Sequence, residues 1–114
     1  MDCIFCKIIA GELPSKKVYE DEKILAFHDI NPAAPVHVIV ISKLHIDSLN
    51  GVNPDNIDYI SGLCLKIPEI AQDLKIADGY RVVTNIGDDG GQTIKHLHFH
   101  ILGGKKLGWN IITQ

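Results

Sequence analysis

The stretch HLHFHIL, residues 96–102, carries three of the six histidines of this 114-residue chain, each separated from the next by one apolar residue. Alternation with a period of two is typical of a β-strand, in which successive side chains point to opposite faces. The pattern predicts a strand with two unlike faces: His96, His98 and His100 opposite Leu97, Phe99 and Ile101. The apolar face can enter a core, so the histidine face requires an explanation of its own.

The composition is that of one folded globular domain spanning residues 1–114, with 46% hydrophobic and 22% charged residues. The formal net charge of −3 shows no excess of basic residues that could bind a phosphate backbone, so we expect no nucleic-acid partner. No apolar run approaches the roughly 20 residues of a membrane-spanning helix, so we expect no membrane association. The N-terminus lacks a basic leading segment with a cleavage site, and the three cysteines are an odd number. These features favour the reducing cytoplasm.

Outside the histidine stretch, strand-like segments alternate with turn-rich ones. Strands are predicted over 16–20, 23–29, 36–42, 79–85 and 98–104, with a tight hairpin at Asp21-Glu22 and a loop over 29–35. Residues 3–13 predict a short helix ended by Gly11 and Pro14. One main helix combined with hairpin-linked strands indicates an α+β fold with an antiparallel sheet of about five strands.

The longest periodic run predicts an amphipathic helix after Asn53-Pro54. Its predicted buried positions are Ile57, Ile60, Leu63, Cys64, Ile67, Ile70, Ala71 and Leu74, and its solvent-facing ones are Asp58, Ser61, Glu69 and Asp73. Pro68 lies inside the run and is expected to kink the helix or split it in two.

From spacing alone, the histidine row is a set of hydrogen-bonded structural residues, a zinc platform or a catalytic site. Just upstream lies GDDGGQT, residues 87–93, in which glycines let the backbone approach a ligand and adjacent amides form an anion-binding concavity. Such a loop in isolation is typical of a hairpin. Next to a histidine row it favours an anionic substrate.

These residues resemble the histidine triad (HIT) family, whose motif HLHFHIL fits in full. The segments AFHDINPAAPVHVIVISKLHI (26–46) and TNIGDDGGQT (84–93), with the Gly pair 103–104, resemble the nucleoside phosphoramidase branch, and the likeness runs from Cys3 to Trp109. The resemblance implies the HIT fold and a homodimer. It also implies an enzyme that hydrolyses purine nucleoside phosphoramidates or related conjugates at the α-phosphorus, through a nucleotidyl-histidine, releasing a nucleoside monophosphate.

The resemblance also assigns roles. His98 is the implied nucleophile, and His100 and His37 are its catalytic partners, with no cofactor required for the chemistry. Relatives that transfer nucleotidyl groups have glutamine at the third triad position, so His100 favours hydrolysis. The implied substrate-binding residues are Asp29 at the ribose, Asn85 beside the phosphate and the ribose, and Gln92 and Thr93 at the phosphate. Those at the base are Phe5, Ile8, Phe27 and Ile30. The last is Trp109, which in related dimers reaches the partner's pocket. Thr93 departs from the usual serine but keeps the hydroxyl. Trp109 packed on its own subunit is the alternative.

The pair Cys3 and Cys6 is a C-x-x-C, which by itself fits a redox pair, half of a metal site or two small buried residues. Some bacterial-type relatives hold a structural zinc ion through such a pair and two histidines. The resemblance therefore implies a zinc site of Cys3, Cys6, His45 and His96.

Two other functions stay open at this point. A zinc hydrolase could use His96, His98 and His100 as ligands of a catalytic metal ion. A regulatory module could bind nucleotides without appreciable turnover.

Overall fold

The computed structural model describes residues 3–108. Its elements are α1 (Ile4–Ile9), β1 (Lys17–Glu20), β2 (Ile24–His28), β3 (Val36–Ser42), the 3-10 turn η1 (Leu49–Gly51), α2 (Ile57–Asp73), β4 (Arg81–Val83) and β5 (His98–Gly103). Neither α-helix in this part of the chain is long and apolar enough to cross a membrane.

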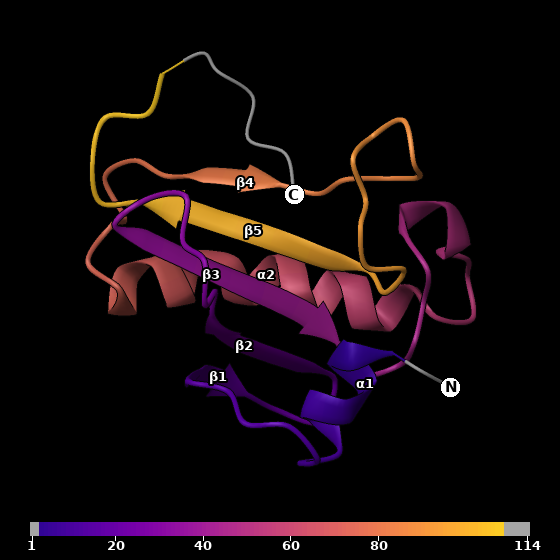
Figure 1. The fold of residues 1–114 in the computed structure, drawn as a ribbon. Helices are drawn as coiled ribbons and strands as arrows, with labels where there is room; N and C mark the ends of the chain where they lie inside the picture. The colour runs from indigo at the N-terminus through magenta and orange to yellow at the C-terminus, as the bar shows by residue number, and fades with distance from the viewer. Residues whose placement is uncertain (1–2, 109–114) are drawn as a thin grey trace.

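The five strands form one antiparallel sheet in the order β1-β2-β3-β5-β4 (Figure 1). The two central strands, β3 and β5, pair in a register that sets Ile41 opposite His98 and Ile39 opposite His100. The predicted α+β fold with a five-stranded antiparallel sheet, one long helix and a short N-terminal helix is confirmed. The predicted strand over 98–104 is found one residue shorter, and His96 precedes it.

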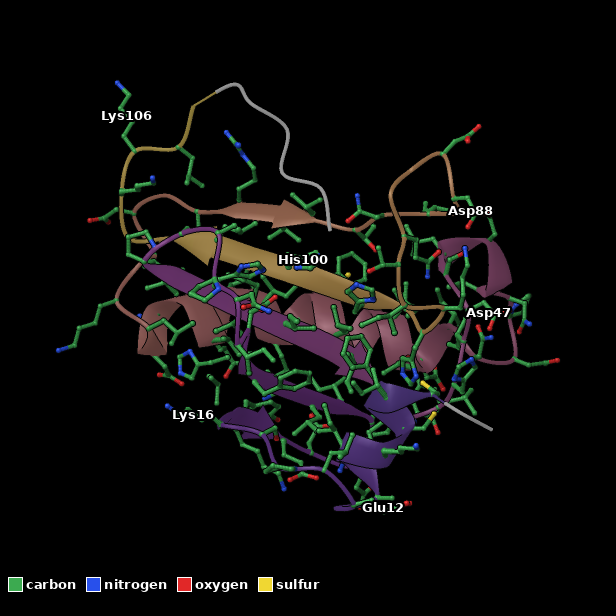
Figure 2. All side chains as sticks on the ribbon, viewed as in Figure 1. Glu12, Lys16, Asp47, Asp88, His100 and Lys106 are labelled. Atoms are coloured by element: carbon green, nitrogen blue, oxygen red, sulfur yellow. The ribbon has the colours of Figure 1, made fainter. Side chains whose placement is uncertain are left out.

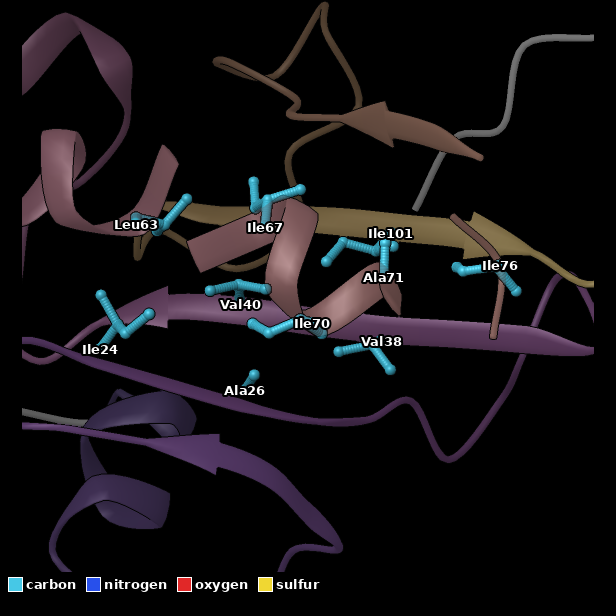
Figure 3. Close-up of a cluster of buried hydrophobic side chains, with 10 residues drawn as sticks. All are labelled: Ile24, Ala26, Val38, Val40, Leu63, Ile67, Ile70, Ala71, Ile76 and Ile101. Carbon is cyan, nitrogen blue, oxygen red and sulfur yellow. The ribbon is translucent and has the colours of Figure 1, made fainter. Parts of the chain in front are cut away.

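The two faces of the sheet have different partners, and α2 covers one of them. Alternate apolar residues of β2, β3 and β5 pack against this helix in one core (Figure 3): Ile24, Ala26, Val38, Val40, Leu63, Ile67, Ile70, Ala71, Ile76 and Ile101. The intervening residues form a second cluster with α1 on the other face: Cys3, Phe5, Leu25, Phe27, Ile39 and Ile41. Because side chains alternate, the histidines of β5 lie on the α1 face.

The short helix α1 ends as the sequence predicts. The backbone N–H of Ala10 donates to the carbonyl of Cys6, and Gly11 takes a positive φ of 79°, which glycine adopts without a Cβ penalty. At the other end, the Sγ of Cys3 accepts the backbone N–H of Cys6 at 3.3 Å and caps the helix.

The structure excludes one of the two outcomes predicted for Pro68 in the long helix, and it contradicts the predicted burial of Cys64 and Ile57. Pro68 does not split it, since α2 runs unbroken from Ile57 to Asp73. The carbonyl that a proline leaves without a partner is that of the residue four positions earlier, here Cys64, and this side of the helix faces solvent. Cys64 was predicted in the core but is exposed, because the buried stripe passes through its neighbour Leu63.

Candidate active site

The histidine row is held at the centre of the sheet. His98 and His100 stand on β5, and His37 stands on the neighbouring strand β3, diagonally opposite His100. All three rings are buried, and Figure 2 shows His100 on the face of the sheet that α1 shares. Three buried imidazoles on adjacent strands therefore form one polar group within an apolar surface.

The surroundings of His98 fix which ring nitrogen carries the proton. Its Nδ1 lies 2.6 Å from the backbone carbonyl of His96, and a carbonyl can only accept, so Nδ1 carries the hydrogen. The Nε2 of the neutral ring is therefore bare. Burial lowers the pKa of His98, which keeps the ring neutral near pH 7. The hydroxyl of Thr84 donates to the carbonyl of His98 at 2.8 Å and holds the backbone at this point.

His37 and His100 are linked in a directed chain of hydrogen bonds. The backbone N–H of Ala33 donates to Nδ1 of His37 at 3.0 Å, so the neutral ring carries its hydrogen on Nε2. This Nε2 lies 2.9 Å from Nδ1 of His100, to which it donates. The remaining hydrogen of His100 is therefore on Nε2, which is buried and has no partner among the described residues. This N–H is therefore free of protein acceptors and can donate to a bound group.

Burial also decides the charge of this pair. It lowers the pKa of His100 to about 4, with further lowering from the neighbouring rings of His98 and His37. Burial likewise lowers the pKa of His37, against the opposing effect of the Asp29 carboxylate, which lies 3.4 Å from its Nε2. Without a ligand both rings are neutral at pH 7.

A cavity of about 490 Å³ opens beside His98. This volume is within the usual range of ligand pockets. Its apolar lining consists of Ile4, Phe5, Ile8, Leu13, Pro14, Phe27, Ile30, Ile39 and Ile94, and its polar lining of Ser15, His28, Asp29, Asn31, Thr93 and His98. Six of the predicted substrate-binding residues are in these two sets: Phe5, Ile8, Phe27, Ile30, Asp29 and Thr93.

Several lining residues were not predicted from the sequence. Leu13, Pro14 and Ser15 lie in the irregular segment between α1 and β1, where no periodic signal exists. Ile39 lies in the apolar run 38–41 of β3, where no residue is marked out from its neighbours as a cavity residue. Trp109 lies outside the described residues.

The other two predicted phosphate residues lie in the glycine-rich loop rather than at the cavity wall. Both N–H groups of the Gln92 side chain donate to backbone carbonyls, of Asp47 at 2.6 Å and of Ile94 at 3.0 Å, while its oxygen accepts the N–H of Gly87. Gln92 therefore braces the loop, and its amide has no hydrogen left for a phosphoryl oxygen.

Asn85 joins the opposite side of the same loop. Its Nδ2 donates to the carbonyl of Gly90 at 2.8 Å, and its Oδ1 is buried without a partner among the described residues. Asn85 lies two residues beyond Val83, which pairs with His100. An unpaired acceptor therefore lies just beyond the end of β4, and an unpaired donor lies on the neighbouring strand β5.

Cys3, Cys6, His45 and His96 form a second group, which we call the Cys/His cluster. One ligand atom from each residue lies within 4.8 Å of the others. The Nε2 of His96 donates to the carbonyl of Ser42 at 2.7 Å, so its Nδ1 is bare and faces Sγ of Cys3 at 3.2 Å. Burial and, to a smaller extent, the neighbouring Cys3 together raise the pKa of the Cys6 thiol to about 11.

The fourth member of the cluster is oriented in the same way. Nδ1 of His45 lies 3.3 Å from Sγ of Cys6, and its Nε2 lies 3.0 Å from a carboxylate oxygen of Asp47. The cluster offers two thiols and two imidazole nitrogens, which match the donor set of a tetrahedral zinc site. Each imidazole ring is oriented by an oxygen acceptor at its other nitrogen. The described residues therefore fit a zinc ion.

The geometry argues against a catalytic metal ion held by the histidine row. Within residues 3–108 no candidate ligand group contains all three of its rings, because His96 belongs to the Cys/His cluster and His100 is grouped with His37 and Asp29. In that second group the facing nitrogen of His37 carries a hydrogen, since its Nδ1 accepts from Ala33.

Comparisons with known proteins agree with this geometry. The family described as "Scavenger mRNA decapping enzyme C-term binding" matches residues 2–110. Protein HitA of Neisseria gonorrhoeae is 47% identical over 102 residues, 90% of this chain and 95% of that protein.

Two solved structures superimpose closely. A HIT family hydrolase from Clostridium thermocellum matches with a TM-score of 0.92 and 48% identity, and a histidine triad protein from Clostridium difficile with a TM-score of 0.92 and 51% identity. Each match covers 97% of both chains.

Proposed function

The chain belongs to the histidine triad (HIT) family, and from this premise we propose that it is a hydrolase of purine nucleoside phosphoramidates or related nucleotide conjugates. His98 attacks the α-phosphorus, a nucleotidyl-histidine forms, and a nucleoside monophosphate is released. Relatives described as HIT family hydrolases support the general class.

One observation carries the proposal, namely the arrangement of protons on the histidine row. His98 offers a bare Nε2 because its Nδ1–H is bonded to the carbonyl of His96. His100 offers an Nε2–H without a partner because its Nδ1 accepts from His37. A nucleophile and a hydrogen-bond donor thus stand on alternate residues of one strand, with their ring centres 5.1 Å apart.

In the first step, Nε2 of His98 forms a bond to phosphorus and the bond from phosphorus to the leaving nitrogen or oxygen breaks. The leaving group takes a proton from Nε2 of His100. Burial keeps the free ring neutral, but a bound phosphoryl anion favours its protonated form, as does the Asp29 carboxylate near His37. The His37–His100 pair therefore takes up a proton on Nδ1 of His100 when substrate binds, as the Nε2–H of His37 turns to the Asp29 carboxylate 3.4 Å away. His100 then delivers its Nε2 proton during bond cleavage.

In the second step, water attacks the phosphorus and the bond to His98 breaks. The proton of the water passes to Nε2 of His100, which restores the starting arrangement. The products are a nucleoside monophosphate and the free imidazole of His98. Because His100 carries a ring nitrogen that can receive this proton, water is the favoured acceptor of the nucleotidyl group.

The cavity supports a nucleotide as the substrate. Its apolar walls, including Phe5 and Phe27 in edge-to-face contact at 5.8 Å, suit a flat base. Asp29 lines the same cavity, which supports assigning its carboxylate as the acceptor of the ribose hydroxyls. Thr93 supplies a hydroxyl for the phosphate, with the loop backbone that Gln92 braces.

We further infer a structural zinc ion in the Cys/His cluster. The ion would join the N-terminal segment to the sheet and would take no part in the chemistry. We also propose the reducing cytoplasm as the location of the protein, because an odd number of cysteines argues against a disulfide framework.

The proposed enzyme is a homodimer. Beside its buried stripe, α2 carries an apolar flank that faces solvent, formed by Ile57, Cys64, Leu65 and Pro68, and Leu65 is 74% exposed. The edge strand β4 lies at the border of the sheet with Val82 41% exposed. An exposed apolar helix flank and a strand at the border of the sheet support burial against a second copy.

The decisive test is mass spectrometry of the acid-quenched protein mixed with adenosine 5′-phosphoramidate, with and without a chelator, beside His98→Ala. We expect a nucleotidyl adduct on His98 that survives the chelator and is absent from the variant. Retained AMP binding by His98→Ala would show that its site is intact.

Two results would contradict the proposal. Turnover that forms no adduct and that the chelator stops would indicate a catalytic metal ion. AMP binding without adduct or turnover would indicate a nucleotide-binding regulatory module.

A further inference from the structure

The Cys/His cluster is bound directly to the nucleophile through His96. The ring of His96 faces Cys3, whereas its backbone carbonyl accepts the Nδ1–H of His98 at 2.6 Å. The same residue therefore belongs to the cluster by its side chain and sets the proton position on His98 by its backbone. A movement of His96 would alter the orientation of the nucleophile.

A second link joins the cluster to the glycine-rich loop through Asp47. The carboxylate of Asp47 lies 3.0 Å from Nε2 of His45, and its carbonyl accepts a hydrogen from the side chain of Gln92 at 2.6 Å. Gln92 in turn closes the loop by accepting the N–H of Gly87. Figure 2 shows Asp47 and Asp88, the residue after Gly87, on the same side of the molecule.

A third link is α1 itself. This helix has six residues, too few for stability in isolation, and Phe5 is its buried residue. Cys3 caps it and Cys6 lies within it, so the cluster fastens both ends of its first turn. The ring of Phe5 packs against His98 with centroids 5.1 Å apart, and Ile4 and Ile8 line the cavity.

The main core has no comparable dependence on the cluster. The residues packed between α2 and the sheet include no member of the cluster and no residue of α1 (Figure 3). Loss of the cluster should therefore loosen α1, His98 and the loop while the sheet and α2 persist.

We propose that the Cys/His cluster is a positioning element of the active site, through which a bound metal ion raises nucleotide affinity. The inference rests on the proposed nucleotide site. A metal ion that holds the four ligand atoms together fixes the cavity wall, the nucleophile and the loop at the same time. Binding linkage is reciprocal, so a nucleotide raises metal affinity by the same factor. We expect a factor of about 5 to 150, the usual range for coupled sites.

The test is calorimetric titration of AMP into protein loaded with Zn²⁺ and into protein stripped of metal, with the reverse titration of Zn²⁺ in the absence and presence of AMP. The factor by which Zn²⁺ raises AMP affinity should equal the factor by which AMP raises Zn²⁺ affinity. Circular dichroism should show that the stripped protein keeps its sheet and α2. Equal AMP affinity in both forms, or global unfolding on metal removal, would overturn the proposal.

One variant tests whether the glycine-rich loop transmits the coupling, and a second variant is its control. Gln92→Met keeps the length of the side chain but cannot form its hydrogen bonds, so we expect Zn²⁺ affinity to persist while the dependence of AMP affinity on zinc shrinks. Cys64→Ser removes an exposed thiol on α2 and should leave both affinities unchanged. An unaltered coupling factor in Gln92→Met would show that the loop does not transmit the effect.

Hydrogen exchange provides a readout that does not depend on nucleotide binding. Addition of Zn²⁺ should slow exchange in α1 and also in residues 87–94, which contain no cluster ligand. If AMP fails to bind even the loaded protein, the proposed function is wrong, and this measurement still decides the coupling. Slower exchange confined to the ligand residues and their immediate neighbours would overturn it.

Discussion

Nε2 of His37 lies 2.9 Å from Nδ1 of His100, across a diagonal between β3 and β5, and the two rings share a single hydrogen bond in a buried setting. Ala33 fixes the direction of this hydrogen bond, because its backbone N–H donates to Nδ1 of His37 and leaves the ring hydrogen on Nε2. The pair is therefore neutral and oriented before any substrate arrives.

The first prediction concerns the pH dependence of stability. Burial lowers the pKa of His100 from 6.5 to about 4, so between these values the unfolded chain binds a proton that the folded chain does not. This contribution to stability is complete above the unfolded pKa and is lost as the pH falls toward the folded one. The loss from His100 between pH 7.5 and pH 5 is about 2 kcal/mol.

Urea unfolding of metal-free protein at these two pH values, beside His100→Gln, measures the effect. The variant should lose less of its free energy of unfolding on acidification than the wild type. Equal losses would show that His100 titrates with an ordinary pKa in the folded protein.

The second prediction concerns the glycine-rich loop. A Cβ at position 90 would lie 2.3 Å from the carbonyl oxygen of Ile86, which is backbone and cannot swing aside. Gly90→Ala should therefore displace the loop at a cost of about 1 to 3 kcal/mol and weaken AMP binding about tenfold or more. Gly79→Ala, where a Cβ meets nothing within 4 Å, is the matched control. Unchanged AMP affinity in Gly90→Ala would separate this loop from the nucleotide site.

The third prediction concerns the core beneath α2. Leu63 is fully buried, and Leu63→Ala should lower the free energy of unfolding by about 2 to 5 kcal/mol, because the cavity left behind cannot fully collapse. Gln72→Ala, at an exposed position of the same helix, should change it by no more than about 0.5 kcal/mol. Chemical denaturation followed by circular dichroism gives both values. A small effect at Leu63 would mean that the helix is held to the sheet by other contacts.

The fourth prediction concerns assembly. Leu65→Glu places a charge on the apolar flank of α2 and should convert the proposed dimer into a 12.6 kDa monomer. Light scattering coupled to size-exclusion chromatography measures the mass directly. Leu44→Glu makes the same change at another exposed leucine and should leave the dimer intact. A dimer that survives Leu65→Glu would exclude this flank as the interface.

The sequence predicts secondary structure best where the spacing of its apolar residues is regular. The alternation in 96–102 predicts β5, and the helical run predicts α2 and most of its buried stripe. Cys64 and Ile57 could not be assigned correctly, because they border that stripe and their exposure depends on which neighbour covers them. The helical run correctly extends past Pro68, and no split occurs there because solvent on that side can satisfy the unpaired carbonyl.

The site is harder to predict because it depends on contacts between distant segments. Sγ of Cys6 meets Nδ1 of His45 across 39 residues, a pairing that the resemblance implied but that no spacing could reveal. The bracing role of Gln92 follows from the carbonyls of Asp47 and Ile94, and backbone groups leave no trace in a sequence. The unpaired Nε2 of His100 is likewise visible only in three dimensions.

The alternation along β5 restricts how this strand can change. Phe99 and Ile101 contact the α2 core, and His98 and His100 face the proposed substrate site. The residues for stability and for the proposed chemistry therefore alternate along one short strand. Substitutions can adjust either set separately. Insertion or deletion of a single residue would exchange the two faces together, placing imidazoles in the core and apolar side chains at the phosphorus. We therefore expect length polymorphism to be absent from this segment in functional variants.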